Sequence, residues 1–372
     1  MFAIRPCPPK YVCLMTLLQH FHDDQSQSAL DLPLRTAKTG CLDREMGAFR
    51  TGLISAEALT ALAPVTKPMR EYPTFSLLPG FLGLALSKGA ADICIAGIPF
   101  DIGTTYRSGA RFGPQAIRKA SHMLADGAHP VNWVDPFALS LADIGDFHVA
   151  LGDIQATLSQ IDSQASPLAH LVALGGDHGV TLPLLRALAR RIGPLALVHF
   201  DAHVDTWPDS FGQPYAHGSV VYHAIEEGLV NSRRVIQIGI RSPVKRGVFD
   251  WTVGKGVTIV TAQEVHEHGP KAVAERIRSV LGDAPSYLSF DIDALDPAFA
   301  PGTGTPEIGG LASWQAQGIV RRLGGLRFVG MDVVEVAPPY DVSDITALAA
   351  ATMAWEYIAL VGAGLRPQSS IR

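Results

Sequence analysis

The sequence predicts an α/β fold of three layers, in which helices cover both faces of a mostly parallel sheet. Apolar runs of strand length alternate with helical stretches over roughly 300 residues, which is typical of such sheets. The acidic motifs of the chain stand directly after these runs, at the strand ends where open parallel sheets bind their ligands. Because no internal repeat or linker interrupts this region, we expect one domain over residues 71–372, preceded by an N-terminal extension of unknown role over residues 1–70.

Seven apolar runs are the expected strands. They cover residues 92–96, 171–174, 195–200, 234–238, 257–260, 287–290 and 327–331. Between them, helices are predicted over residues 113–124, where Pro114 suits a first helical turn, and over residues 270–281. Parallel strands need crossovers of this kind, and the alternation therefore favours a parallel sheet.

The C-terminal stretch 345–365 is about long enough to cross a bilayer. It contains Glu356 near its middle and much alanine, which favours a helix buried in the protein over a membrane span. We expect Ser343 or Asp344 to cap this helix. No membrane is therefore expected as a partner.

The composition describes a globular protein with a large core. Of its 372 residues, 47% are hydrophobic and 17% are charged. A net charge of −5 without a basic cluster argues against nucleic acid as a partner. The four cysteines show no zinc-type spacing and residues 1–21 lack the pattern of a signal peptide, so we expect reduced thiols in a cytoplasmic protein.

Two acidic runs dominate the chain. Asp201, His203 and Asp205 follow one expected strand, and Asp291 and Asp293 follow another. Alternate residues of an extended chain share a face, so the acids and the histidine can point together. Carboxylates brought to one place repel by roughly 4 kcal/mol per close pair at an effective dielectric near 20, and a positive charge between them is therefore required.

A third segment, residues 174–179, adds His178 after another apolar run. Two histidines and several carboxylates indicate two divalent cations, with manganese as the first choice, and the lack of thiols argues against a cysteine-type zinc site. A water held between two such cations is polarised towards hydroxide and can attack an electron-poor carbon. The alternative for the Asp201 motif alone is a polar loop with helix-capping residues.

In these motifs the chain resembles the ureohydrolase family, which includes arginase and agmatinase. The resemblance rests on residues 175–178, 200–205, 289–297, 300–310 and 330–338. It covers residues 72–372 and implies the three-layer fold that arginases share with the related deacetylases. It also implies a homo-oligomer, either a trimer or a hexamer.

The resemblance implies a hydrolase that releases urea from a linear guanidino compound with two Mn²⁺ ions per subunit, for which Ni²⁺ is a possible substitute. One ion would take His178, Asp201, Asp205 and Asp291, and the other would take Asp201, His203, Asp291 and Asp293. Asp201 and Asp291 would then bridge the two ions, and Asp205 would also orient the attacking hydroxide. All six ligand types are present, and we expect an active centre.

Two further residues match catalytic positions of the family. Glu335 matches the carboxylate that binds the guanidinium group, for which paired hydrogen bonds are suitable. His217 matches the histidine of an active-site loop, and an imidazole suits proton transfer to the leaving amine. The alternatives are a surface carboxylate for Glu335 and a loop histidine held by backbone groups for His217. We expect a packed or hydrogen-bonded core role for His199.

The loop over residues 206–216 departs from the arginase pattern, because aromatic residues and prolines replace the polar residues that bind an amino-acid head group. The resemblance is thus closer to agmatinase, which converts agmatine to putrescine and urea, or to guanidinobutyrase. Asp209 is a candidate to bind the ammonium group of agmatine. A carboxylate tail would instead need Arg107, Arg111 or Tyr215.

The segment 97–114 resembles the first active-site loop of the family, and a structural turn is the alternative. Two different classes of function also remain. A non-catalytic binding protein on this scaffold would lack a bridging ligand, and none is missing. A deacetylase with a single zinc would use fewer acidic ligands, and Asp293 and His178 argue against it.

Overall fold

The computed structural model describes residues 78–89 and 91–365. The expected N-terminal extension, residues 1–70, lies outside the described residues, as do three of the four cysteines. The fourth, Cys94, is a buried free thiol, and burial raises its pKa. The described residues form a fold that is built on a single eight-stranded sheet.

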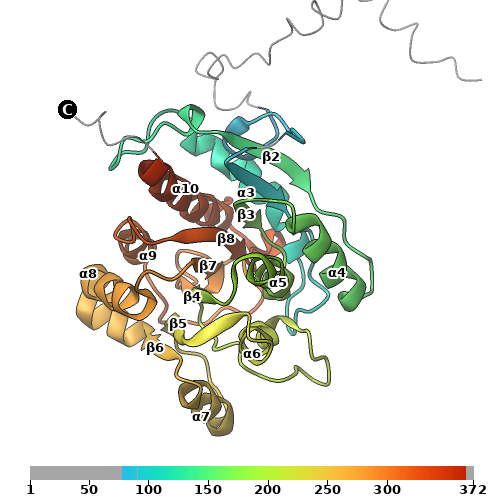
Figure 1. The fold of residues 1–372 in the computed structure, drawn as a ribbon, viewed down its shortest axis with the longest axis vertical. Coiled ribbons are helices and arrows are strands. Elements are labelled where there is room, and N and C mark those ends of the chain that lie inside the picture. The colour runs from blue at the N-terminus through green and yellow to red at the C-terminus, as the bar shows by residue number, and fades with distance from the viewer. Residues whose placement is uncertain (1–77, 90, 366–372) are drawn as a thin grey trace, which may run out of the picture. The chain divides into compact units, whose positions relative to one another are not determined.

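All strands of this sheet run parallel, in the order β2-β1-β3-β8-β7-β4-β5-β6 (Figure 1). They are β1 (Ile93–Gly97), β2 (Leu141–Asp146), β3 (Leu171–Leu174), β4 (Leu195–Phe200), β5 (Val230–Ile240), β6 (Thr258–Thr261), β7 (Ser286–Asp291) and β8 (Phe328–Val334). The predicted α/β fold is confirmed, and the sheet is wholly parallel where a mostly parallel one was expected.

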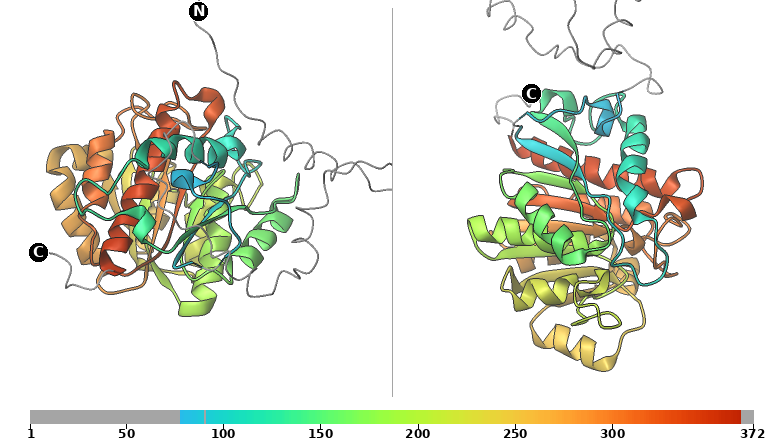
Figure 2. Two further views of the ribbon diagram at one scale, coloured as in Figure 1. Left: turned by 90° about the horizontal axis from the view of Figure 1, so that it is seen from above. Right: turned by 90° about the vertical axis from the view of Figure 1, so that its right-hand side faces the viewer.

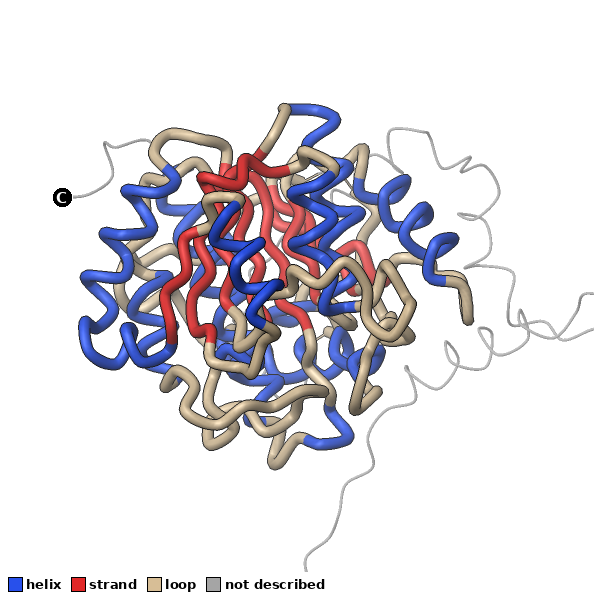
Figure 3. Tube along the Cα trace, turned by 90° about the horizontal axis from the view of Figure 1, so that it is seen from below, coloured by secondary structure: helices blue, strands red, loops and turns tan. Residues whose placement is uncertain are grey.

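Helices cover both faces of the sheet, as Figures 2 and 3 show. They are α3 (Gly113–Ser121), α4 (Ile154–Ala165), α5 (Thr181–Ile192), α6 (Val220–Glu226), α7 (Arg246–Gly254), α8 (Ala262–Leu281), α9 (Ser313–Val320) and α10 (Ile345–Leu365). Helices α3, α8, α9 and α10 share one apolar core with the sheet, whereas α4, α5 and α6 share the other. The fold therefore has the three layers expected.

Successive residues of a strand face the two cores in turn. In β1, Ile93 and Ile95 belong to the core with α10, and Cys94 and Ala96 belong to the core with α5. Because both faces are buried, the strands are continuous apolar runs rather than alternating ones.

Strand β2 is the one strand that the apolar pattern misses, because it contains two aspartates and a glycine. Asp143 is fully buried, and the Nε atom of Arg118 on α3 donates to its Oδ2 atom at 2.8 Å. The same guanidinium donates to Asp146. A buried arginine thus neutralises the acids of this strand, and hydrophobicity alone does not reveal such pairing.

Helix α8 begins at Ala262, well before the predicted start at Pro270. Thr261 and Glu264 form a capping box, in which the Glu264 backbone N–H donates to the Thr261 hydroxyl at 3.2 Å and the Thr261 N–H donates to the Glu264 carboxylate at 2.8 Å. The chain kinks at Gly269, where φ is 72°. Pro270 therefore begins the second part of the helix, where its missing N–H and fixed φ are tolerated.

One helix of the described residues, Ile345–Gly364, is long and apolar enough to cross a membrane. Of its most apolar window, 67% is buried within the fold. Glu356, the acid in its middle, accepts hydrogen bonds from Arg321 and contacts the ring of His129 at 2.8 Å. These contacts agree with the predicted core helix.

The expected cap of α10 was wrong. Neither Ser343 nor Asp344 caps the helix with its side chain; both have positive φ values, of 55° and 58°. The carboxylate of Asp341 accepts instead from the backbone N–H groups of Thr346 and Ala347, at 2.9 and 3.0 Å. An aspartate before the turn therefore satisfies the first free donors of the helix.

The four central strands carry the predicted site. Strands β3, β8, β7 and β4 are neighbours in that order, and His178, Glu335, Asp291 and Asp201 stand at or just past their carboxyl ends. Because all strands are parallel, these ends meet at one edge of the sheet. The topology thus brings together side chains that are distant in sequence.

Candidate metal centre and catalytic site

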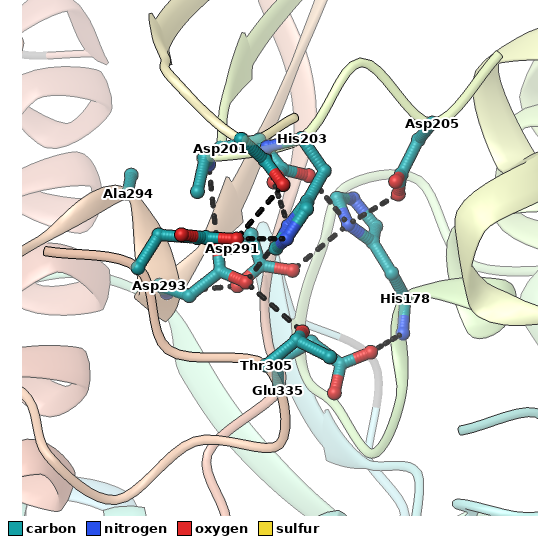
Figure 4. A network of polar contacts seen from close by, with 12 residues as sticks. His178, Asp201, His203, Asp205, Asp291, Asp293, Ala294, Thr305 and Glu335 are labelled. Atoms are coloured by element: carbon teal, nitrogen blue, oxygen red, sulfur yellow. Dashed lines mark hydrogen bonds and ion pairs between the residues drawn. The ribbon is translucent and has the colours of Figure 1, made fainter. Parts of the chain in front are cut away.

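His178 faces three carboxylates (Figure 4). Its Nδ1 atom lies 3.2 Å from Asp201 Oδ2, 3.2 Å from Asp205 Oδ2 and 3.1 Å from Asp291 Oδ2. His178 is 1% exposed, and Asp201 is fully buried. One imidazole nitrogen and three carboxylate oxygens thus converge on one point, as expected for the first metal.

A second cluster lies next to the first. The Nδ1 atom of His203 is 3.2 Å from Asp201 Oδ1 and 3.1 Å from Asp293 Oδ2. Asp201 therefore directs one oxygen to each histidine. Asp291 contacts the first cluster, and its other oxygen accepts from the Asp293 backbone N–H at 2.8 Å.

The electrostatics of these clusters fit a pair of cations. Burial and the charges of Asp293 and Asp201 raise the pKa of Asp291 well above its ordinary value. Burial alone would raise the pKa of Asp201, but the neighbouring histidines hold it well below the usual range. The Oδ2 atom of Asp201 is buried and has no well-aligned hydrogen-bond partner among the described residues. Buried carboxylate oxygens that repel one another, together with imidazole nitrogens, are the donors that a divalent cation such as Mn²⁺ accepts.

A chain of hydrogen bonds sets the orientation of His178. Its Nε2 atom lies 2.8 Å from the Ser289 hydroxyl, which donates to Asp332 at 2.6 Å. Thr181 and Tyr287 also donate hydroxyl protons to this carboxylate. Because Ser289 gives its proton to Asp332, its oxygen accepts the Nε2 proton of His178, and Nδ1 keeps a lone pair towards the acids. This is how metal-binding histidines are commonly held.

Asp332 was not assigned a role from the sequence, although it lies in a motif that carries the resemblance. Burial raises its pKa, while the three hydroxyl donors favour the ionised form. The available signal was an aspartate inside β8, where an unpaired charge would be costly. Its hydroxyl partners come from other elements, and no local pattern indicates them.

Glu335 connects the metal clusters to His217. Its Oε1 atom accepts from the backbone N–H of His178 at 2.7 Å and lies 2.9 Å from His217 Nδ1. Its Oε2 atom is buried without a hydrogen-bond partner among the described residues. Glu335 is thus a fully buried residue with one free carboxylate oxygen, and the surface alternative for this residue does not apply.

His217 has two opposing influences on its proton. Burial alone would lower its pKa, but the charge of Glu335 and the hydrogen bond to it raise the pKa to about 9. On the other side of the ring, the Thr105 backbone N–H donates to Nε2 at 3.1 Å, and the Thr105 hydroxyl lies 2.8 Å away. The backbone N–H contact favours an unprotonated Nε2, in opposition to the effect of Glu335. The ring is therefore placed to gain and lose a proton at that atom.

Two site residues adopt strained backbone conformations. Asp205 has a φ of 49° and Glu335 has a φ of 64°, in a region that non-glycine residues rarely adopt. Such strain costs of order 1–3 kcal/mol and persists where the surrounding structure enforces it, often at functional sites. Here it accompanies two carboxylates turned towards the metal clusters.

The glycines before His178 have a structural purpose. A Cβ atom at Gly176 would lie 1.7 Å from the carbonyl oxygen of Phe100, and one at Gly175 would lie 2.6 Å from the Val334 side chain. These residues thus let the segment after β3 pass between the segment that follows β1 and the end of β8.

A cavity of about 580 Å³ opens onto the metal clusters. It is lined by Thr105, His203, Asp205, Trp207, Asp209, Ser210, Phe211, His217, Gly218, Ser242, Pro243, Lys245, Asp291 and Thr305. The cavity brings Asp209, one of the predicted tail contacts, to the same space as the metal ligands. Ser242 and Lys245 follow β5 and were not identified from the sequence, because the run after that strand has no acidic or histidine motif.

The other predicted tail contacts lie elsewhere. Arg107 and Tyr215 are not among the residues that line the cavity. The Arg107 guanidinium stacks on the rings of Tyr106 and Tyr340, and Tyr215 packs against His223. The interpretation of Arg107 and Tyr215 as direct tail contacts is therefore not supported by this geometry.

An ion pair holds the segment 97–114, the predicted first active-site loop, in its conformation. The Nε atom of Arg111 donates to Asp101 Oδ1 at 2.5 Å, and the Gly109 backbone N–H donates to Asp101 Oδ2 at 2.7 Å. Arg111 is thus committed to Asp101, which agrees with the structural-turn alternative. Thr105, in the middle of the loop, is the residue that reaches the cavity.

The metal-free protein is expected to lose stability as the pH rises from 6.5 to 9. Folding raises the pKa of His217 to about 9 and raises those of His178 and His203 well above 6.5, mainly through contacts with carboxylates that outweigh burial. A raised pKa contributes stability below the unfolded value, and that stability is lost as the pH passes the folded value. The raised pKa of Asp291 acts in the same direction.

Thermal unfolding in a chelating buffer between pH 6.5 and 9 measures this effect. Saturating Mn²⁺ should remove much of the slope, because the cations replace the protons between the carboxylates. A melting temperature that stays constant or rises over this window without metal would contradict the assigned contacts.

Comparisons with known proteins identify the family of this chain. A model of the Arginase family matches residues 91–359. Agmatinase of Neisseria meningitidis serogroup C (strain 053442) is 46% identical over 294 residues, which are 76% of this chain and 93% of that protein. The structure of a hypothetical agmatinase from Burkholderia thailandensis is 43% identical with a TM-score of 0.74 and covers 78% of this chain and 92% of its own.

Proclavaminate amidino hydrolase from Streptomyces clavuligerus is also similar to this chain. It is 39% identical with a TM-score of 0.75, over 78% of this chain and 99% of its own. The family match spans most of the described residues, including both metal clusters, Glu335 and His217. The chain belongs to the arginase family and is an amidinohydrolase that acts on the C–N bonds of linear amidines.

Proposed function

We propose that this enzyme hydrolyses agmatine to putrescine and urea at a binuclear metal centre. The observation that carries the proposal is the free Oε2 atom of Glu335, a buried carboxylate oxygen next to the metal clusters. A buried anion of this kind needs a cationic hydrogen-bond donor, and a guanidinium group supplies one with matching geometry. The agmatinases that are 46% identical to this chain support the choice of agmatine.

Six residues would hold the two cations, for which Mn²⁺ is the first choice and Ni²⁺ the second. They are His178, Asp201, His203, Asp205, Asp291 and Asp293. When bound, the cations supply a nucleophile at neutral pH by lowering the pKa of water. Everything else that the reaction needs comes from side chains of this chain.

Glu335 and His217 divide the remaining work. Glu335 Oε2 pairs with the guanidinium group and so fixes its carbon against the metal clusters. His217 lines the cavity, and in its protonated form it passes a proton to the nitrogen of the leaving amine. The contact between His217 Nδ1 and Glu335 Oε1 fixes the positions of the two side chains relative to each other.

Two residues that line the cavity are candidates to bind the tail of the substrate. Asp209 lines the cavity and is exposed, as an ammonium partner would be. Lys245 lines the same cavity and is also exposed. The lysine favours a guanidino acid, such as guanidinobutyrate, as the alternative substrate.

A urea-release panel tests the proposal. We expect agmatine to give the highest kcat/KM among agmatine, guanidinobutyrate, guanidinopropionate and arginine. Chelation should abolish turnover, and added Mn²⁺ should restore it more fully than Ni²⁺. Full turnover in demonstrably metal-free protein would reject the mechanism.

The matched variants Asp209→Asn and Lys245→Gln separate the two substrates. With agmatine, we expect Asp209→Asn to raise KM by about tenfold, the effect of roughly 1.4 kcal/mol, and Lys245→Gln to leave KM unchanged. The reverse pattern, with guanidinobutyrate as the better substrate, would select the guanidino acid. A homo-oligomer and a cytoplasmic location stay predictions.

A further inference from the structure

His199 lies close to Asp201, the carboxylate that faces both metal clusters. The family resemblance does not assign His199 as a ligand of either ion. It lies on β4, is fully buried, and places its Nε2 atom 3.0 Å from Asp201 Oδ2. Its ring also packs against that of His178, with centroids 4.9 Å apart. The expected core role describes its burial but not its contact with Asp201.

The proton of His199 is located by Gln237. These two residues are register partners on the adjacent strands β4 and β5. The Nε2 atom of Gln237 lies 2.7 Å from the Val204 carbonyl oxygen, which only accepts, and this contact fixes the orientation of the amide. The same nitrogen lies 3.0 Å from His199 Nδ1 and donates its second proton there.

His199 Nδ1 is therefore an acceptor, and the proton of the neutral ring is on Nε2. The Nε2 atom lies 3.0 Å from Asp201 Oδ2, within ion-pair distance, and neither atom has a well-aligned hydrogen-bond partner among the described residues, so each is free to serve the other. A carboxylate oxygen has two lone pairs, so Oδ2 can accept this proton and still bind a cation.

An alternative is that His199 is itself a metal ligand. Its ring nitrogen lies within 4.8 Å of the ligand atoms of His178, Asp201 and Asp205. A ligating nitrogen needs a free lone pair, however. The Nδ1 lone pair is used by Gln237, and Nε2 carries the proton.

We propose that His199 is a positioning residue for the metal centre: its Nε2–H group holds Asp201 with one oxygen towards each cluster. Gln237 and Val204 act through His199 by fixing its tautomer. This inference rests on the proposed binuclear function, because Asp201 matters in this way only as a shared ligand. Groups that orient metal ligands commonly change metal affinity by about 10-fold to 100-fold.

The variants His199→Met and His199→Gln test this role. The two replacements have nearly the same length and volume, but only glutamine offers an N–H group where Nε2 stood. Titration of the chelator-stripped, full-length protein with Mn²⁺ alone, by calorimetry and by electron paramagnetic resonance, gives the number of bound ions and their dissociation constants. This readout does not depend on turnover.

We expect His199→Met to bind two ions about 10-fold to 100-fold more weakly and His199→Gln to recover most of the affinity. His129→Met is the matched control, because His129 is 1% exposed and contacts Glu356 rather than a metal ligand. It should lower thermal stability and leave the Mn²⁺ affinity unchanged.

Wild-type affinity in His199→Met would overturn the proposal. Loss of one bound ion in His199→Gln would also overturn it, because that result makes His199 a ligand. If His199→Met fails to fold, the stoichiometry and affinity of His199→Gln decide the question alone. A wild-type protein that binds no Mn²⁺ would instead count against the proposed function.

Discussion

Replacement of Asp291 by asparagine is expected to reduce urea release by about 10³-fold or more, because the cations supply several kcal/mol of stabilisation to the transition state. Asp291 lies 3.1 Å from His178 Nδ1 within the first cluster, and the resemblance assigns it to both ions. Metal content should fall together with activity. Elemental analysis after gel filtration and a urea assay measure the two losses.

The same variant should be as stable as the wild type, or more so, when both are metal-free. Burial and the charges of Asp293 and Asp201 raise the pKa of Asp291, which means that the ionised carboxylate is unfavourable in the empty cluster. Asp250→Asn is a suitable control, since Asp250 lies on the exposed face of α7 and pairs with Arg246. Wild-type metal content in Asp291→Asn would refute the ligand assignment.

Replacement of Glu335 by glutamine is expected to lower kcat/KM by roughly 30-fold to 5,000-fold while both ions stay bound. Removing one partner of a buried charge pair costs about 2–5 kcal/mol, and the partner here is the substrate guanidinium. Glu335 contacts no metal cluster directly and accepts from the His178 backbone. Metal analysis and steady-state kinetics separate this loss from loss of the cations.

The variant should also change the pH profile. The charge of Glu335 is the largest influence that raises the pKa of His217 to about 9, and its removal lets burial lower that pKa. A general acid acts below its pKa, so the alkaline limb of the residual activity should move to lower pH. Glu356→Gln, at a buried glutamate that pairs with Arg321, should reduce stability without moving that limb. If the alkaline limb of the Glu335→Gln pH profile stays at the wild-type position, His217 is not the general acid.

The proposed ligand set could be derived from the sequence because each of its residues follows a strand within a few residues. Asp201, His203 and Asp205 are one local motif, and a parallel sheet makes the strand ends converge whatever the strand order is. The order itself, with β8 between β3 and β7, does not follow from any local pattern. The apolar runs also identified the central strands, because a strand that is buried on both faces is a continuous apolar run.

The contacts that support the ligands could not be predicted in this way. Ser289 and Asp332 hold His178 from two different strands, and Gln237 meets His199 only through the register of β4 and β5. Of the predicted tail contacts, only Asp209 lines the cavity. Lys245 reaches the cavity, whereas Arg107 does not line it, because loop paths depend on packing rather than on motif spacing.

The strand order has a consequence for the growing polypeptide. All six proposed metal ligands precede residue 294, yet β3 and β7 are joined only through β8, which spans Phe328–Val334. A nascent chain that has not yet released β8 from the ribosome therefore carries every ligand but lacks the strand that sets His178 beside Asp291. The proposed metal centre is therefore expected to assemble only after β8 has been synthesised and has joined the sheet.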